Sequence, residues 1–233
     1  PFAARPAADA RLDGTPAELV GDTRHGVRAI APMLNVTRVW NAVSAVSLLR
    51  RGLALARAYA AGRVVFGAPL IDQPLHLETL ADLQAELEAA THLVFFAVEL
   101  LGRREHPGGD DATGALLRLV TPIVKLLTGK LVVAGLSEVC EAFGGAGYVE
   151  DTGIPSLLRD AQVLPIWEGT TNVLSLDVLR VLAQSGGLQG WLVALRELAA
   201  DTQSEELAPV VRLVRQTATR AAEWLVRHSK ARD

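Results

Sequence analysis

The sequence predicts an all-α protein: an antiparallel four-helix bundle with additional helices at its C-terminal end. Half of the 233 residues are apolar but only 5% are aromatic, and leucine, alanine and valine dominate, which suits packed helices better than a sandwich of strands. Apolar residues also recur at steps of three and four over long stretches. This spacing places side chains on one face of a helix.

The first two long helices are predicted from this period, one from about Val27 to the break at Gly62–Pro74 and the next after Pro74. The second has a 3.5-residue repeat, typical of helices packed at shallow angles in a bundle. The residues expected on the buried face of the first are Val39, Val43, Val46, Leu49, Leu53, Ala56 and Ala60. Those expected in the second are Leu80, Leu83, Leu87, Ala90, Val94, Ala97 and Leu101.

A third long helix is expected from Ala115 to Phe143, and because it is apolar on most sides it should lie at the centre of the bundle. Asp110 or Asp111 is the expected N-cap. Pro122 should kink this helix or mark a late start.

Three regions follow from the pattern. Residues 1–25 are an irregular lead-in with a short strand expected at Ala17–Val20. Residues 26–185 form the bundle, which a fourth helix at Thr171–Gln184 completes. Residues 186–233 add two helices, at about 188–200 and 205–228.

Composition excludes several classes of function. The net charge is -3 and the pI is near 6.0, so no global field attracts nucleic acid or an anionic membrane. Lys125 and Lys130 interrupt the most apolar run, and residues 1–25 lack a signal sequence. The single cysteine, Cys140, fits a reducing cytoplasm. The five histidines lack metal-ligand spacing. We therefore expect a cytoplasmic protein with no membrane partner and no bound metal.

Glu168 is the most informative residue. It lies between an apolar run that ends in Trp167 and the start of a helix. Burial beside Trp167 would disfavour the charged form of the carboxyl group and favour its use as a general base. Gly169 frees the backbone, and Thr170 or Thr171 could cap the helix that follows. The alternative is a buried or loop glutamate before an ordinary capped helix.

A glycine cluster at Gly144, Gly145 and Gly147 could hold a phosphate with its backbone N–H groups, or could simply end the third helix. Arg38 lies early in the first helix among apolar neighbours. It could bind an anionic ligand or pair with a local acid such as Asp22.

Arg63 offers a guanidinium beside the ring of Phe66 and the flexible backbone of Gly67. These groups suit a phosphate and an adenine, although an arginine at a helix end is commonly a surface residue.

Three segments in order resemble the C-terminal half of an acyl-CoA dehydrogenase, over roughly residues 15–185. They are TRVWNAVSAVSLLRRGLALARAYAAGRVVFGAPLIDQP (residues 37–74), CEAFGGAGYVEDTGIPSLLRDA and IWEGTTNVLSLDVLR. Trp167, Asn172 and the LDVLRVL ending most resemble the AidB-like branch, whose members respond to alkylation damage and bind DNA. In this family the lead-in would be a remnant of a middle β-domain, and the bundle would bind flavin and acyl-CoA.

The resemblance implies α,β-dehydrogenation of an acyl-CoA thioester with FAD as the cofactor. Glu168 would be the base that removes the α-proton, and its backbone N–H would help to hold the thioester carbonyl. The positions that match flavin contacts are Arg63, Phe66, Gly67, Glu141, Phe143, Gly144, Gly145, Gly169, Thr170 and Asn172. Those that match substrate contacts are Arg38, Asn35, Trp167 and Gly169. In the family, the residues from Glu141 to Gly145 reach the flavin of a neighbouring subunit, and a dimer of dimers is usual.

Some features depart from the family. Asn35 stands where many relatives have an aspartate, Glu141 replaces a common glutamine, and Gln73-Pro74 replaces a common His-Gln. The chain also lacks the N-terminal helical domain and most of the β-domain. We therefore expect a fragment that folds but does not bind FAD tightly or turn over substrate by itself.

Two other functions remain open. One is a DNA-binding flavoprotein of the AidB type, favoured by basic residues of the last helix and opposed by the net acidity of the chain. The other is a structural bundle that mediates oligomerisation. The basic residues concerned are Arg212, Arg215, Arg220, Arg227, Lys230 and Arg232.

Overall fold

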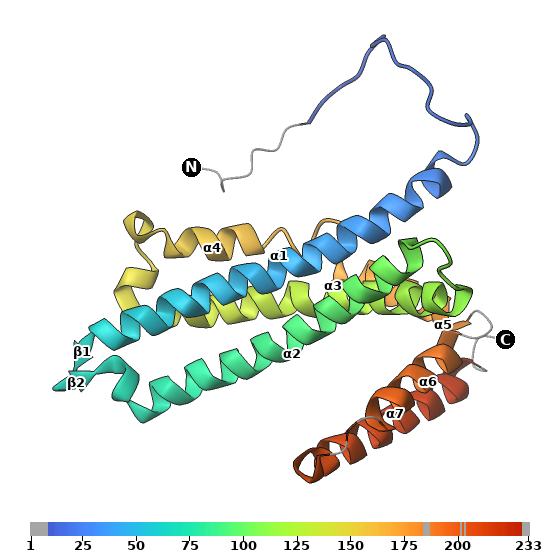
Figure 1. Ribbon diagram of the computed structural model, residues 1–233. Coiled ribbons are helices and arrows are strands. Elements are labelled where there is room, and N and C mark those ends of the chain that lie inside the picture. The colour runs from blue at the N-terminus through green and yellow to red at the C-terminus, as the bar shows by residue number, and fades with distance from the viewer. Residues whose placement is uncertain (1–8, 184–186, 201, 203, 230–233) are drawn as a thin grey trace.

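The computed structural model describes residues 9–183, 187–200, 202 and 204–229. Three long helices lie side by side and alternate in direction: α1 (Gly26–Gly62), α2 (Pro74–Glu105) and α3 (Asp111–Ala142) (Figure 1). Two shorter helices, α4 (Ile154–Ala161) and α5 (Thr171–Ala183), together take the fourth position. The predicted all-α bundle is confirmed.

Helix α3 is central, as predicted, because it contacts α1, α2, α4, α5 and α6. The carboxylate of Asp110 caps it by accepting a hydrogen bond from the backbone N–H of Thr113 at 2.6 Å. The helix begins at Asp111, so Pro122 lies inside it and does not mark a late start. By length and composition α3 could cross a membrane, but its packing against five helices accounts for its apolar character.

Glycines let α1 and α3 approach closely. A Cβ atom at Gly135 of α3 would lie 2.6 Å from a methyl carbon of Leu49, and one at Gly52 of α1 would clash with Leu136. Leu49 and Leu136 are both fully buried in the shared core, so this crossing has no room for larger side chains.

Short elements connect the helices. A two-stranded antiparallel hairpin, β1 (Val64–Val65) and β2 (Ala68–Pro69), follows α1 and leads through the 3-10 helix η1 (Leu70–Asp72) into α2. The 3-10 helices η2 (Gly144–Gly147) and η3 (Glu150–Thr152) link α3 to α4. Residues 9–25, all described, are irregular, so the strand expected at Ala17–Val20 is wrong.

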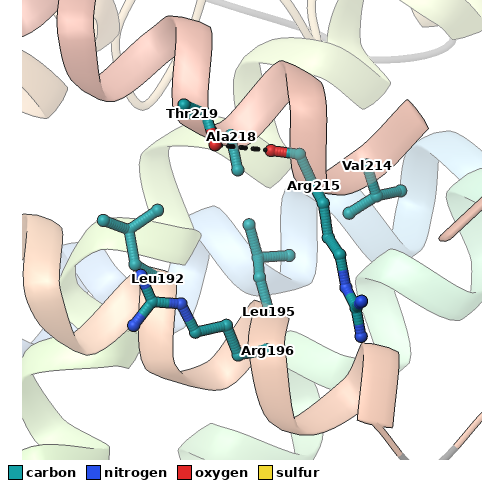
Figure 2. A pocket seen from close by; sticks show the side chains of 7 residues that line it. All are labelled: Leu192, Leu195, Arg196, Val214, Arg215, Ala218 and Thr219. Carbon is teal, nitrogen blue, oxygen red and sulfur yellow. Dashed lines mark hydrogen bonds between the residues drawn. The ribbon is translucent and has the colours of Figure 1, made fainter. Parts of the chain in front are cut away.

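The C-terminal helices α6 (Gly187–Ala200) and α7 (Ala208–Ser229) form a hairpin, with η4 (Glu205–Leu207) between them, that projects from the bundle (Figure 1). Helix α6 contacts α3 and α5, and α7 packs on α6. A hollow of about 380 Å³ lies between α6 and α7, and Figure 2 shows the side chains that line it. Its lining residues are Leu192, Leu195, Arg196, Val214, Arg215, Ala218 and Thr219.

Candidate functional site

The segment from residue 162 to residue 170 joins α4 to α5 and carries Glu168. Its turns are held by the carbonyl oxygen of Val163, which accepts hydrogen bonds from the N–H groups of Ile166 and Trp167, both at 3.0 Å. The buried side chain of Asn41, on α1, donates from Nδ2 to the carbonyl oxygen of Leu164 at 3.3 Å. The segment is therefore fastened to the bundle just before the glutamate.

A glycine in α3 makes room for the same segment. A Cβ atom at Gly129 would lie only 3.2 Å from the Cα atom of Pro165. Ordinary carbon contacts in a packed interior are nearer 3.5–4.0 Å, so any larger residue at this position would press the segment outwards.

Glu168 itself has an unusual backbone. Its φ angle is 59° and that of Gly169 is 108°, so two successive residues lie at positive φ. Glutamate rarely adopts this conformation, and such residues persist where their surroundings hold them in place, often at functional sites. The Oε2 atom of Glu168 is buried and has no hydrogen-bond partner among the residues that the structure describes. A buried carboxylate oxygen without a partner is available to a ligand or a proton.

Two cations hold this backbone. Arg38, on α1, donates from Nε to the carbonyl oxygen of Glu168 at 3.0 Å. Lys125, on α3, donates from Nζ to the carbonyl oxygen of Gly169 at 2.5 Å. Burial and the charge of Arg38 lower the pKa of Lys125 from 10.5 to about 8, while the Glu168 carboxylate opposes this shift.

Sequence reasoning missed the role of Lys125 and treated it only as a charge that interrupts an apolar run. Its side chain is fully buried in the structure. Its position in the middle of the most apolar helix could have indicated a buried lysine with a specific partner, because a lysine is almost never fully buried without one.

Arg38 is in turn held by a buried acid. Its Nη1 atom donates to Asp177 Oδ2 at 2.9 Å. Arg118 binds both oxygens of Asp177, at 3.1 Å and 2.6 Å, and Arg180 approaches it at 3.4 Å. Burial opposes ionisation of Asp177, but hydrogen bonds and charges of Arg118 and Arg38 outweigh it and lower the pKa of the carboxyl group. The acid that pairs with Arg38 is thus Asp177 on α5, whereas Asp22 pairs with Arg24.

This cluster lines a hollow of about 290 Å³ between α1, α3 and α5. Asn35 and Arg38, both predicted to contact substrate, meet here with Arg118, Asp177 and Arg180. Three arginines around one buried aspartate leave the hollow with excess positive charge, which suits an anionic ligand. Apolar side chains complete the lining: Ala31, Leu34, Val173 and Leu176. Trp167, the other predicted substrate residue, is 44% exposed beside Glu168.

A second hollow, of about 560 Å³, lies where α1 and α3 end. It brings together five of the residues predicted to contact flavin: Arg63, Glu141, Phe143, Gly144 and Gly145. The ring of Phe143 stacks on that of Tyr59, with 4.6 Å between centroids. His76 also lines the hollow, and its buried Nε2 atom has no hydrogen-bond partner within the part of the chain that the structure covers.

The predicted flavin residues do not all converge. Phe66 is 99% exposed at the tip of the β1–β2 hairpin, with Gly67 beside it. Gly169, Thr170 and Asn172 lie near Glu168 at the start of α5. Since 25 residues of helix separate Arg38 from Arg63, the two hollows are about 37 Å apart along α1. A single chemical group of a ligand, such as one phosphate, therefore cannot contact both hollows.

The family model described as "Acyl-CoA dehydrogenase, C-terminal domain" matches residues 24–183, which is more than half of the chain. The chain belongs to the acyl-CoA dehydrogenase family. Acyl-CoA dehydrogenase family member 11 of Caenorhabditis elegans is 48% identical over 205 residues, covering 86% of this chain and 33% of the relative. The acyl-CoA dehydrogenase named AidB of Escherichia coli is 39% identical over 171 residues, covering 73% and 31%.

A solved structure extends the comparison. The crystal structure of C. elegans ACDH-11 in complex with C11-CoA matches with a TM-score of 0.88 and 44% identity, over 91% of this chain and 36% of that one. The chain thus spans about a third of the length of these curated relatives. Because the C. elegans protein is more similar than AidB, the predicted AidB-like branch is not supported, and the comparisons give no support for DNA binding.

Proposed function

We propose that this chain is the C-terminal part of an FAD-dependent acyl-CoA dehydrogenase in which Glu168 removes the α-proton of the substrate. One observation carries the proposal: the Oε2 atom of the Glu168 carboxylate is buried without a hydrogen-bond partner among the described residues, on a left-handed backbone held by two cations. A solvated loop glutamate would need none of these features.

The proposed substrate is an acyl-CoA thioester. The hollow lined by Asn35, Arg38, Arg118 and Arg180 supports this class, since its excess positive charge suits the phosphates of coenzyme A. That the C. elegans relative was crystallised with C11-CoA is consistent with this class.

In the proton-transfer step, Glu168 accepts the α-proton through its carboxylate, and its backbone N–H helps to hold the thioester carbonyl oxygen. Negative charge then grows on that oxygen. The nearby charges of Arg38 and Lys125 and the N-terminal end of α5 favour it.

The residues present fit a dinucleotide at the second hollow. The unpartnered Nε2 atom of His76 can bond a ribose or adenine, and Arg63 can pair with a phosphate. Glu141 places a negative charge in the same hollow, which weakens the fit to a pyrophosphate. When bound, FAD supplies the acceptor for the hydride that leaves the β-carbon.

The same proposal includes a cytoplasmic location, based on composition, and assembly into a homo-oligomer. Since the chain spans about a third of its relatives, we do not expect it to bind FAD tightly or to turn over substrate alone. Exposed apolar side chains on several helices support burial against other domains or subunits. Examples are Met33, Val36, Trp40, Phe95 and Leu127.

Anaerobic reduction of the flavin by acyl-CoA tests the proposal in the full-length protein that it implies. Glu168→Gln should keep the flavin spectrum but slow reduction by at least roughly a thousandfold. Glu138→Gln, at an exposed position of α3, is the matched control and should reduce flavin at the wild-type rate. If the flavin of the Glu168→Gln variant is still reduced at the wild-type rate, the base is another residue.

A further inference from the structure

We propose that Lys125 is a positioning residue for Glu168: its ammonium group and the Arg38 guanidinium together fix the two successive carbonyl groups that set the direction of the carboxylate. The two contacts, from Lys125 to the carbonyl oxygen of Gly169 and from Arg38 to that of Glu168, are called the clamp below. The role of the clamp in catalysis rests on the function proposed above, whereas the clamp itself can be tested in this chain alone.

The geometry carries the proposal. Lys125 Nζ lies 2.5 Å from the carbonyl oxygen of Gly169, and Arg38 Nε lies 3.0 Å from that of Glu168. Because consecutive carbonyls are held, the peptide unit between Glu168 and Gly169 cannot rotate without losing a charge-assisted bond. That peptide unit joins the two residues at positive φ, so the cations act where the backbone is strained.

The clamp also ties three helices together. Lys125 reaches the segment from α3, and Arg38 reaches it from α1. Arg38 is oriented by Asp177 of α5, which Arg118 of α3 holds through both oxygens. The position of Glu168 is therefore fixed by contacts from the helices of the bundle as well as by the turns that precede it.

A purely structural role explains Lys125 poorly. A fully buried ammonium group is costly, and replacing buried ion pairs by apolar side chains is often neutral or stabilising. The charged groups that act on Lys125 are Arg38, on α1, which disfavours its charged form, and Glu168, which favours it. The lysine thus stands beside a like charge in an apolar helix, an arrangement that packing alone would not select.

Hydrogen exchange of the chain, followed by mass spectrometry, tests the clamp without flavin or substrate. Lys125→Met removes the ammonium group at similar side-chain length, and Lys130→Met changes an exposed lysine five residues further along α3. The N–H groups of Ile166 and Trp167 report on the segment, because both are hydrogen-bonded to Val163. Loss of one charge-assisted bond should speed their exchange by roughly ten- to a hundredfold in Lys125→Met.

The proposal predicts that this acceleration is confined to residues near 163–175 and is absent in Lys130→Met. Unchanged exchange in Lys125→Met would overturn it. An equal acceleration in every helix would overturn it too, because that would show a loss of global stability only. If Lys125→Met does not fold, Lys125→Gln, which keeps a donor but no charge, serves under the same criteria.

A second measurement uses the intact lysine. The chain contains three lysines, so ¹³C labelling of their ε-carbons gives few NMR signals, and Lys125→Met or Lys125→Gln assigns that of Lys125. Because the Glu168 charge raises the pKa of Lys125, Glu168→Gln should lower it. An unchanged titration would show that the ammonium group does not sense the carboxylate and would overturn the positioning role. If the clamp passes both tests while Glu168→Gln retains activity, the clamp stands and the proposed catalytic role of Glu168 fails.

Discussion

The buried lysine makes the stability of this chain depend on pH in a direction that is easy to test. Lys125 has a pKa of about 8 in the folded chain against an ordinary value of 10.5. Between these values the folded state binds fewer protons than the unfolded state, so the free energy of unfolding rises with pH. The stabilisation is complete above the unfolded pKa and is lost as the pH falls through the folded one.

The size of the effect follows from the two pKa values. Between pH 7 and pH 9 the contribution of Lys125 to the free energy of unfolding should increase by about 1.3 kcal/mol. Other groups also titrate in this range, so the wild-type chain alone does not isolate the lysine. Subtracting the values for Lys125→Met removes those shared contributions, because the variant lacks only this titrating group.

Urea unfolding followed by circular dichroism at pH 7, 8 and 9 provides the measurement. The difference in unfolding free energy between the wild-type chain and Lys125→Met should shift in favour of the wild type by about 1.3 kcal/mol over this range. A difference that stays constant would show that Lys125 has an ordinary pKa in the folded chain. A difference that shifts the other way would refute the burial argument altogether.

Two further predictions concern the surroundings of the glutamate. Asp177→Asn should lower the unfolding free energy by about 2 kcal/mol, because the partly buried guanidinium groups of Arg38 and Arg118 lose their buried counter-charge. Urea titration beside the exposed control Asp151→Asn measures this, and equal losses in the two variants would contradict it. Gly129→Ala should cost about 1 kcal/mol by pressing on Pro165, whereas Gly190→Ala, which meets nothing within 4 Å, should gain roughly 0.5–1 kcal/mol. Thermal melting of both variants decides it, and a stabilised Gly129→Ala would show that the segment yields freely.

The helices could be predicted because their signals are local. Periodic apolar residues fixed the buried faces of α1 and α2, and residues such as Leu53 and Leu87 are buried as expected. The described lead-in forms no strand at Ala17–Val20. A strand needs a neighbouring strand with which to pair, and the turn-rich sequence of the lead-in does not show whether one is available. The limits of α3 were better marked by the Asp110 cap than by Pro122, which lies within the helix.

The site was only partly predictable, because its key contacts join distant residues. Arg38 and Asp177 are 139 positions apart, and no periodic pattern links them. Local sequence therefore singled out Glu168 and Arg38, which the structure brings into contact, but left the partner of Arg38 open. The contact of Lys125 could not be predicted, because its partner is the backbone carbonyl group of Gly169 and every residue carries such a group.

Deuterium uptake at the α-carbon of an acyl-CoA tests the role of Glu168 most directly. In heavy water the full-length protein should exchange this proton, and Glu168→Gln, with flavin still bound, should reduce the rate at least roughly a thousandfold. Exchange at the wild-type rate in Glu168→Gln would contradict its assignment as the base.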